Sequence, residues 1–224
     1  MIPIALLHLC DSLFPIGAFG YSDGLEAATA SGAVRTPDDL REWLDTCLDE
    51  SVGRVEGPAV HRAWLAFAQR DWPTLDRLDQ ELTAMRPSAS ARHSSRAMGA
   101  QLLTTWHALH PDRNLQQLLD RTRLNKRGIA LPVAFGSACA DIGVDGRDAA
   151  TAFAYTRLAS VMSASMRLMP IGQTKAHQQL AAVLARVPAV VDQLIKLEAL
   201  EAFAPAQDIA LMTQPHLPSR LFRS

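Results

Sequence analysis

The sequence predicts an all-α fold: a single helical domain over residues 1–224, with about nine or ten helices and an extended C-terminal tail. Alanine and leucine are abundant while isoleucine and threonine are few, which favours helix over sheet. Apolar residues recur at helical spacing along most of the chain. Prolines and capping residues divide it into segments of helical length, and no pair of strand-like segments appears.

Capping residues and prolines mark the helix starts in the N-terminal half. A hydroxyl before a helix accepts a hydrogen bond from a free amide of the first turn, and a proline at the first helical position loses no bond. Thr36 followed by Pro37 is the clearest such start, and Gly53 is predicted to end that helix. The predicted helices of this half cover residues 4–10, 26–31, 37–52, 58–68, 73–86 and 88–110.

The C-terminal half follows the same pattern up to residue 200. Its predicted helices cover residues 115–119, 132–139, 148–169, 172–187 and 190–200, and Gly136 is expected to allow close approach of a neighbouring helix. Pro205, Pro215 and Pro218 then interrupt the chain, so at most one helical turn is expected, near Ile209. The end of the chain is therefore predicted to be a tail without a core to join.

Composition limits the function classes. Of 224 residues, 48% are hydrophobic and 20% charged, and the net charge of −1 gives no electrostatic reason to bind nucleic acid or an anionic membrane. Three widely spaced cysteines form no metal-type pair and indicate a reducing compartment. The apolar start lacks the basic leader of a signal peptide, and no segment has 18 uninterrupted apolar residues. These features predict a cytoplasmic protein.

Residues 11–26, DSLFPIGAFGYSDGLE, are unusual for a connector, and we call them the signature segment. Phe14, Phe19 and Tyr21 are three of only nine Phe and Tyr residues in the chain, counted as seven Phe and two Tyr. Pro15 and three glycines give the segment a non-helical backbone. We therefore expect it to bury its aromatic residues, either as an elbow that seals the helical core or as a docking surface.

The signature segment resembles the N-terminal signature of the UreF family of urease accessory proteins. The resemblance recurs in family order at residues 96–99 (RAMG), 132–136 (PVAFG), 167–173 (RLMPIGQ) and 220–224 (RLFRS). Ala18, where the family usually has glycine, and Pro218, where it usually has an aromatic residue, depart from the pattern.

This resemblance implies a helical, often dimeric scaffold of urease maturation that is not an enzyme and needs no cofactor. Such proteins bind the accessory protein UreD (UreH in some organisms), recruit the nickel-carrying GTPase UreG and act on apo-urease. The tail at residues 215–224 is implied to bind UreD and to order on binding. The partner-binding residues carried over from the family are Phe14, Pro15, Gly17, Phe19, Tyr21, Glu26, Arg96, Arg167, Gln173, Arg220, Leu221, Phe222, Arg223 and Ser224.

No catalytic constellation is apparent in the sequence. His107 and His110, spaced i, i+3, could reach one metal ion, but a histidine at a helix C-terminus is also favoured by the helix dipole. The basic run at residues 121–127 is either a solvated loop or a docking patch for an acidic partner. Two other classes stay open: a helical enzyme with a dispersed active site, and a small helical transcription regulator, although the N-terminus lacks a basic helix-turn-helix.

Overall fold

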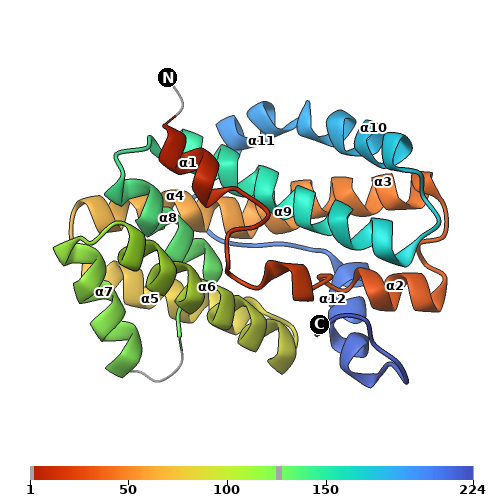
Figure 1. Cartoon of the computed structure of the whole chain (residues 1–224), viewed down its shortest axis with the longest axis horizontal. Helices are drawn as coiled ribbons and strands as arrows, with labels where there is room; N and C mark the ends of the chain where they lie inside the picture. The colour runs from red at the N-terminus through yellow and green to blue at the C-terminus, as the bar shows by residue number, and fades with distance from the viewer. Residues whose placement is uncertain (1–2, 125–127, 224) are drawn as a thin grey trace.

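The computed structural model describes residues 3–124 and 128–223, and over these ranges it is all-α without a strand, as the sequence predicts (Figure 1). The elements are α1 (Ile4–Leu9), the 3-10 turn η1 (Ala18–Gly20), α2 (Leu25–Ser31), α3 (Pro37–Thr46), the π-helical η2 (Cys47–Glu56), α4 (Gly57–Ala68), α5 (Trp72–Met85), α6 (Ala89–Leu109), α7 (Arg113–Leu124), α8 (Leu131–Asp141), α9 (Gly146–Leu168), α10 (Gln173–Leu184), α11 (Val187–Leu194), α12 (Pro205–Thr213) and η3 (Gln214–His216). Within the described ranges, no helix is long and apolar enough to cross a bilayer.

The predicted helix caps are present. Thr36 Oγ1 accepts a hydrogen bond from the Asp39 amide at 3.1 Å, and the Asp39 carboxylate accepts one from the Thr36 amide at 2.8 Å. This reciprocal pair is a capping box, with Pro37 as the first residue of α3. Ser88 likewise accepts a hydrogen bond from the Ala91 amide at the start of α6. Local side-chain chemistry therefore sets these starts, which is why the sequence predicts them.

The predicted helix end at Gly53 is wrong. The chain continues from α3 through η2 into α4 without leaving helical geometry. A Cβ on Gly53 would lie 3.1 Å from Val190 Cγ1, so this glycine allows α11 to pack closely. Pro58 has no amide for an ordinary i−4 bond, and the π-helical stretch that precedes it changes the hydrogen-bond register there.

Two clusters of buried apolar residues form the core, and α9 contributes to both. Phe153 packs with α4, α6 and α8 in the first cluster, while its neighbour Ala154 and then Leu158 face α2, α3 and α10 in the second. In Figure 1, α9 accordingly runs through the middle of the molecule. The close approach predicted at Gly136 is confirmed, because a Cβ there would lie 2.4 Å from the Val60 carbonyl oxygen of α4.

The C-terminal region is more ordered than the sequence predicts. The helix expected over residues 190–200 is α11, which begins earlier and ends at Leu194, and the single turn expected near Ile209 is the nine-residue helix α12. Buried Gln207 fastens α12 to the body of the protein, since its amide donates to the Trp43 carbonyl at 3.1 Å and accepts from Ser51 at 3.0 Å. A glutamine in a tail-like sequence gives no sign of such long-range bonds.

Candidate functional site

The signature segment and the C-terminal tail contact each other directly. The Glu26 carboxylate accepts hydrogen bonds from the backbone amides of Leu221, at 2.5 Å, and Phe222, at 3.2 Å. The Arg223 amide donates to the Gly20 carbonyl at 2.7 Å. Three consecutive amides of the tail are therefore held by the signature segment, almost 200 residues earlier in the chain.

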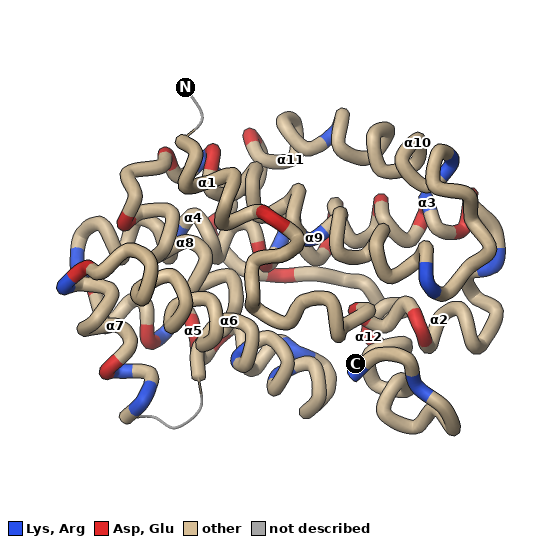
Figure 2. Tube along the Cα trace, viewed as in Figure 1, with Lys and Arg blue, Asp and Glu red and all other residues tan. Residues whose placement is uncertain are grey.

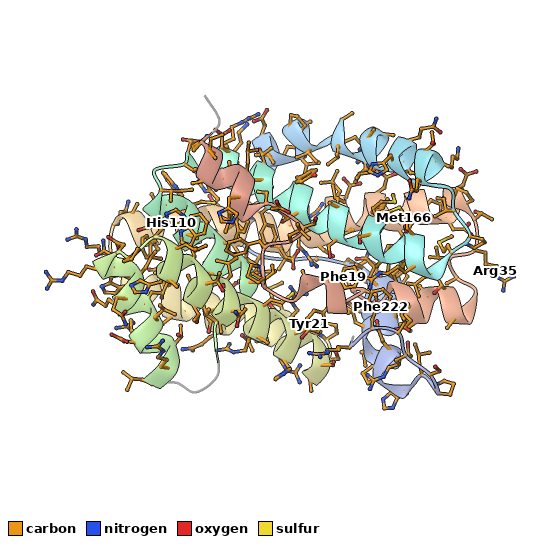
Figure 3. The ribbon with its side chains drawn as sticks, in the orientation of Figure 1. Phe19, Tyr21, Arg35, His110, Met166 and Phe222 are labelled. Atoms are coloured by element: carbon orange, nitrogen blue, oxygen red, sulfur yellow. The ribbon has the colours of Figure 1, made fainter. Side chains whose placement is uncertain are left out.

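Arg167, from the last turn of α9, lies between the two segments. Its guanidinium carbon is 3.8 Å from the ring centroid of Phe19 and 4.1 Å from that of Phe222. Its Nη2 also donates to the Phe19 carbonyl at 2.8 Å. A cation close to the faces of two aromatic rings is attracted by the quadrupole of each, so Arg167 links α9, the signature segment and the tail. Figure 3 shows Phe19 and Phe222 close together, with His110 towards the opposite end of the molecule.

Phe222 corrects the expectation that the tail has no core to join. Only 3% of its surface is exposed, and it belongs to the second core cluster together with Leu25 and Met169. The expectation that the signature segment buries its aromatic residues holds in part. Phe14 is buried, and its ring centroid is 5.9 Å from that of Trp106, whereas Tyr21 is half-buried and Phe19 is 68% exposed.

A second set of bonds joins the signature segment to the region just before the tail. Gln214 is fully buried, and its amide nitrogen donates to Ser22 Oγ at 2.9 Å and to the Glu26 carboxylate at 3.3 Å. Gly24 has φ +82°, and a Cβ there would lie 3.1 Å from the Leu211 amide nitrogen of α12. The sequence contains no signal for Ser22 or Gln214, because their partners lie far away along the chain.

The exposed part of this contact combines apolar and cationic groups, and we call Phe19, Arg167, Arg220, Leu221 and Arg223 the tail–loop surface. Leu221 is 62% exposed, although the next residue, Phe222, is buried in the contact. Arg220, which precedes Leu221, and Arg223, which follows Phe222, are also exposed. An aromatic ring, an aliphatic side chain and arginines are the residue types enriched in protein–protein interfaces.

Several residues carried over from the family pattern are not among the five that form this surface. Arg96 ties α6 to α5 through an ion pair with Asp79 at 3.0 Å and also donates to the Gly128 carbonyl. Gln173 is exposed as the first residue of α10. Pro15 and Gly17 are exposed in the signature segment, and Ser224 lies outside the described residues.

A cavity of about 490 Å³ adjoins the tail–loop surface beneath the signature segment. Its walls are mostly apolar and include Phe14, Phe153 and Cys10, with Arg167 and Phe19 at the side nearest the tail. Burial raises the pKa of the Cys10 thiol to about 12. Cys10 is therefore a neutral thiol at physiological pH and is not an activated nucleophile.

The remaining candidates from the sequence are the two histidines at the end of α6 and the basic run at residues 121–127. His110 packs against Trp106, with ring centroids 4.3 Å apart. Across residues 3–124 and 128–223, no three His, Cys, Asp or Glu side chains are grouped as metal ligands. In the basic run, Arg121 forms an ion pair with Asp76, and residues 125–127 lie outside the described part of the chain. Figure 2 shows acidic and basic residues interspersed over the helices.

The fold and this site define an all-α protein in which the signature segment and the C-terminal tail form one exposed surface. The family model UreF matches residues 34–184, and the chain belongs to the UreF family. It is 33% identical to the urease accessory protein UreF of Azoarcus sp. (strain BH72), over 99% of this chain and 95% of that protein. It is 30% identical to the urease accessory protein UreF of Granulibacter bethesdensis, over 98% of this chain and 92% of that protein.

The tail–loop surface lies largely outside the segment that the family model matches. Of its five residues, only Arg167 falls within residues 34–184. The two relatives nevertheless align over 99% and 98% of this chain, which is more than the segment matched by the family model.

Proposed function

We propose that this chain is a non-enzymatic accessory protein of urease maturation, and that the tail–loop surface binds the UreD (UreH) protein. The observation that carries the proposal is the contact of Glu26 and Arg167 with the tail. The Leu221 side chain stays exposed, while the backbone amides of Leu221 and Phe222 are held by Glu26. A fixed surface loses less conformational entropy on binding than a disordered tail does.

In this proposal the protein binds UreD and recruits the GTPase UreG, and the assembly inserts nickel into apo-urease. The protein acts as a homodimer in the cytoplasm and uses no cofactor of its own. Its contribution is coupling: it binds the GTP- and nickel-loaded state of UreG with a different affinity from the spent state, and that difference controls metal release. Equal affinity for both nucleotide states of UreG would contradict the coupling.

The experiment is size exclusion with light scattering on the protein alone, with UreD from the same organism, and with UreD and UreG together. The proposal predicts a dimer alone and stoichiometric complexes in the two mixtures. A protein that forms no complex in either mixture would contradict the proposed function. Repeating the measurement with UreG in its GTP-bound and GDP-bound forms tests the coupling separately.

The alternative of a helical enzyme draws its support from the cavity beneath the signature segment, since enzyme sites are commonly apolar clefts of such a size. The chemistry of its wall favours the accessory protein instead. Cys10 is held neutral by burial, and apolar side chains dominate the lining. A cavity of this kind suits the apolar side chains of a partner better than a reaction that needs an activated group.

A further inference from the structure

Four charged side chains from four parts of the chain form a group that includes one residue of the signature segment. Arg157 of α9 is 7% exposed, and its Nε donates to the Glu56 carboxylate at 2.9 Å. Its Nη2 contacts the Asp23 carboxylate at 2.5 Å. Arg86, after α5, contacts the second oxygen of Glu56. Two guanidinium groups and two carboxylates balance in formal charge, so each group depends on the others for compensation.

The two carboxylates differ in their surroundings. Glu56 is 3% exposed at the end of η2, and two arginines hold it in the interior. The side chain of Asp23 is 24% exposed and belongs to the signature segment, with Arg157 as its ion-pair partner. Asp23 is therefore the member that attaches the signature segment to the buried group.

Neighbouring residues of the segment contact the C-terminal region. Ser22 bonds to Gln214, Gly24 packs against α12, and Glu26 holds the tail amides. Asp23 lies between them with φ +50° and contacts α9. Aspartate is among the few residue types that adopt this left-handed conformation at small cost. The backbone turn at Asp23 thus joins the tail contacts to the helical body.

We propose that Arg157 is a positioning residue: through Asp23 it fixes the signature segment so that the segment can hold the C-terminal tail in place. Arg157 is buried and does not belong to the tail–loop surface, so it acts on that surface only through Asp23. Arginine suits the position because one planar guanidinium can bond two carboxylates in different directions, which a single ammonium point charge does less well. The consequence for partner binding rests on the proposed function, whereas the positioning itself does not.

The test uses Asp23→Ala, because Asp23 is partly exposed and its removal leaves Glu56 paired with both arginines. Asp192→Ala is the matched control, since Asp192 pairs with another α9 arginine, Arg147, at 2.8 Å and contacts no part of the signature segment in the interactions described. The measurement is amide hydrogen exchange of the full chain, resolved at residues 221–223 and, for comparison, in α4 and α8.

We expect Asp23→Ala to speed exchange at residues 221–223 by at least about tenfold while α4 and α8 keep their protection. Asp23→Asn, which keeps an oxygen acceptor for Arg157, should speed it less, and Asp192→Ala should not change it. Unchanged exchange at residues 221–223 in Asp23→Ala would overturn the inference, as would an equal loss of protection throughout the chain.

Affinity for UreD, measured on the same variants, separates the inference from the proposed function. Weaker binding by Asp23→Ala in step with faster exchange supports both. Faster exchange of the tail with unchanged UreD affinity supports the positioning role of Arg157 and contradicts the assignment of UreD to the tail–loop surface.

Discussion

The guanidinium carbon of Arg167 lies 4.1 Å from the ring centroid of Phe222, so the last turn of α9 is in contact with the penultimate described residue of the chain. The same guanidinium carbon lies 3.8 Å from the ring centroid of Phe19. Two segments that the family resemblance names separately are therefore one structural unit in this protein. The predictions below test what holds this unit together and what it binds.

Phe222→Ala should lower the free energy of unfolding by about 3 kcal/mol, the usual cost of truncating a buried phenylalanine. The ring is 3% exposed in the second core cluster, so its loss leaves a cavity and removes one face of the Arg167 contact. Chemical denaturation followed by circular dichroism measures the change. Phe203→Ala is the control, because Phe203 is 81% exposed and its truncation should change stability little.

Glu26→Gln should weaken the attachment of the tail without unfolding the helices. The carboxylate accepts two backbone amides and the Gln214 amide, and hydrogen bonds to a charged acceptor contribute about 1.5–3 kcal/mol. A neutral glutamine keeps an acceptor oxygen but loses the charge. Limited proteolysis near residue 220 should be faster in the variant. A tail as protected as in the wild type would contradict the role given to Glu26.

Arg167→Lys keeps the charge but removes the planar group that covers both rings. We expect a loss of about 1–2 kcal/mol, the range for cation–π contacts that are partly desolvated. The stability should be compared with that of Arg54→Lys, whose side chain is 48% exposed on a surface ion pair. A smaller effect for Arg167→Lys than for Arg54→Lys would show that the sandwich between Phe19 and Phe222 contributes little.

Asp141 should make stability depend on pH. Burial, together with the nearby Asp112 carboxylate, raises its pKa from 3.8 to about 6. A carboxyl with a raised pKa in the folded state stabilises the fold while protonated, so this contribution is lost as pH rises through about 6. Asp141→Asn should therefore be more stable than the wild type at pH 7.5, and the difference should shrink towards pH 5.

A control with the opposite sign is available at Asp192, whose pKa is lowered by its hydrogen bond and ion pair with Arg147. Asp192→Asn should lose a small and constant amount of stability between pH 8 and 5, because the contribution of a carboxyl with a lowered pKa disappears only as the pH falls below the ordinary value of 3.8. Thermal melts of both variants between about pH 3 and 8 test the two signs together. If the melting temperatures of Asp141→Asn and the wild type changed with pH in parallel, Asp141 would not be the source of the pH dependence.

The sequence predicts the helices where local chemistry determines them. Thr36 and Ser88 act as caps as expected, and the close packing at Gly136 is present. It fails where a distant partner decides the outcome. Gly53 does not end a helix because α11 packs over it, and α12 is longer than the prolines suggest because Gln207 bonds to α3 and η2.

In the candidate site, too, the sequence indicates the segments involved but not their long-range contacts. The family resemblance selects the signature segment and the tail, but neither composition nor periodicity indicates that they touch. Contacts such as those of Glu26 with Phe222 and of Ser22 with Gln214 join residues more than 180 positions apart. The sequence gives no sign of Arg157 and Asp23 for the same reason, since a single arginine in a helix that packs into both core clusters has no local signature.

The most direct test of the tail–loop surface is the affinity for UreD of Leu221→Asp against Leu124→Asp. Both leucines are exposed, by 62% and 83%, so neither change should disturb the core. We predict that Leu221→Asp weakens binding by at least about tenfold, because a charge in an interface core is unfavourable, and that Leu124→Asp binds like the wild type. Equal affinity of Leu221→Asp and the wild type would contradict the claim that UreD docks on this surface.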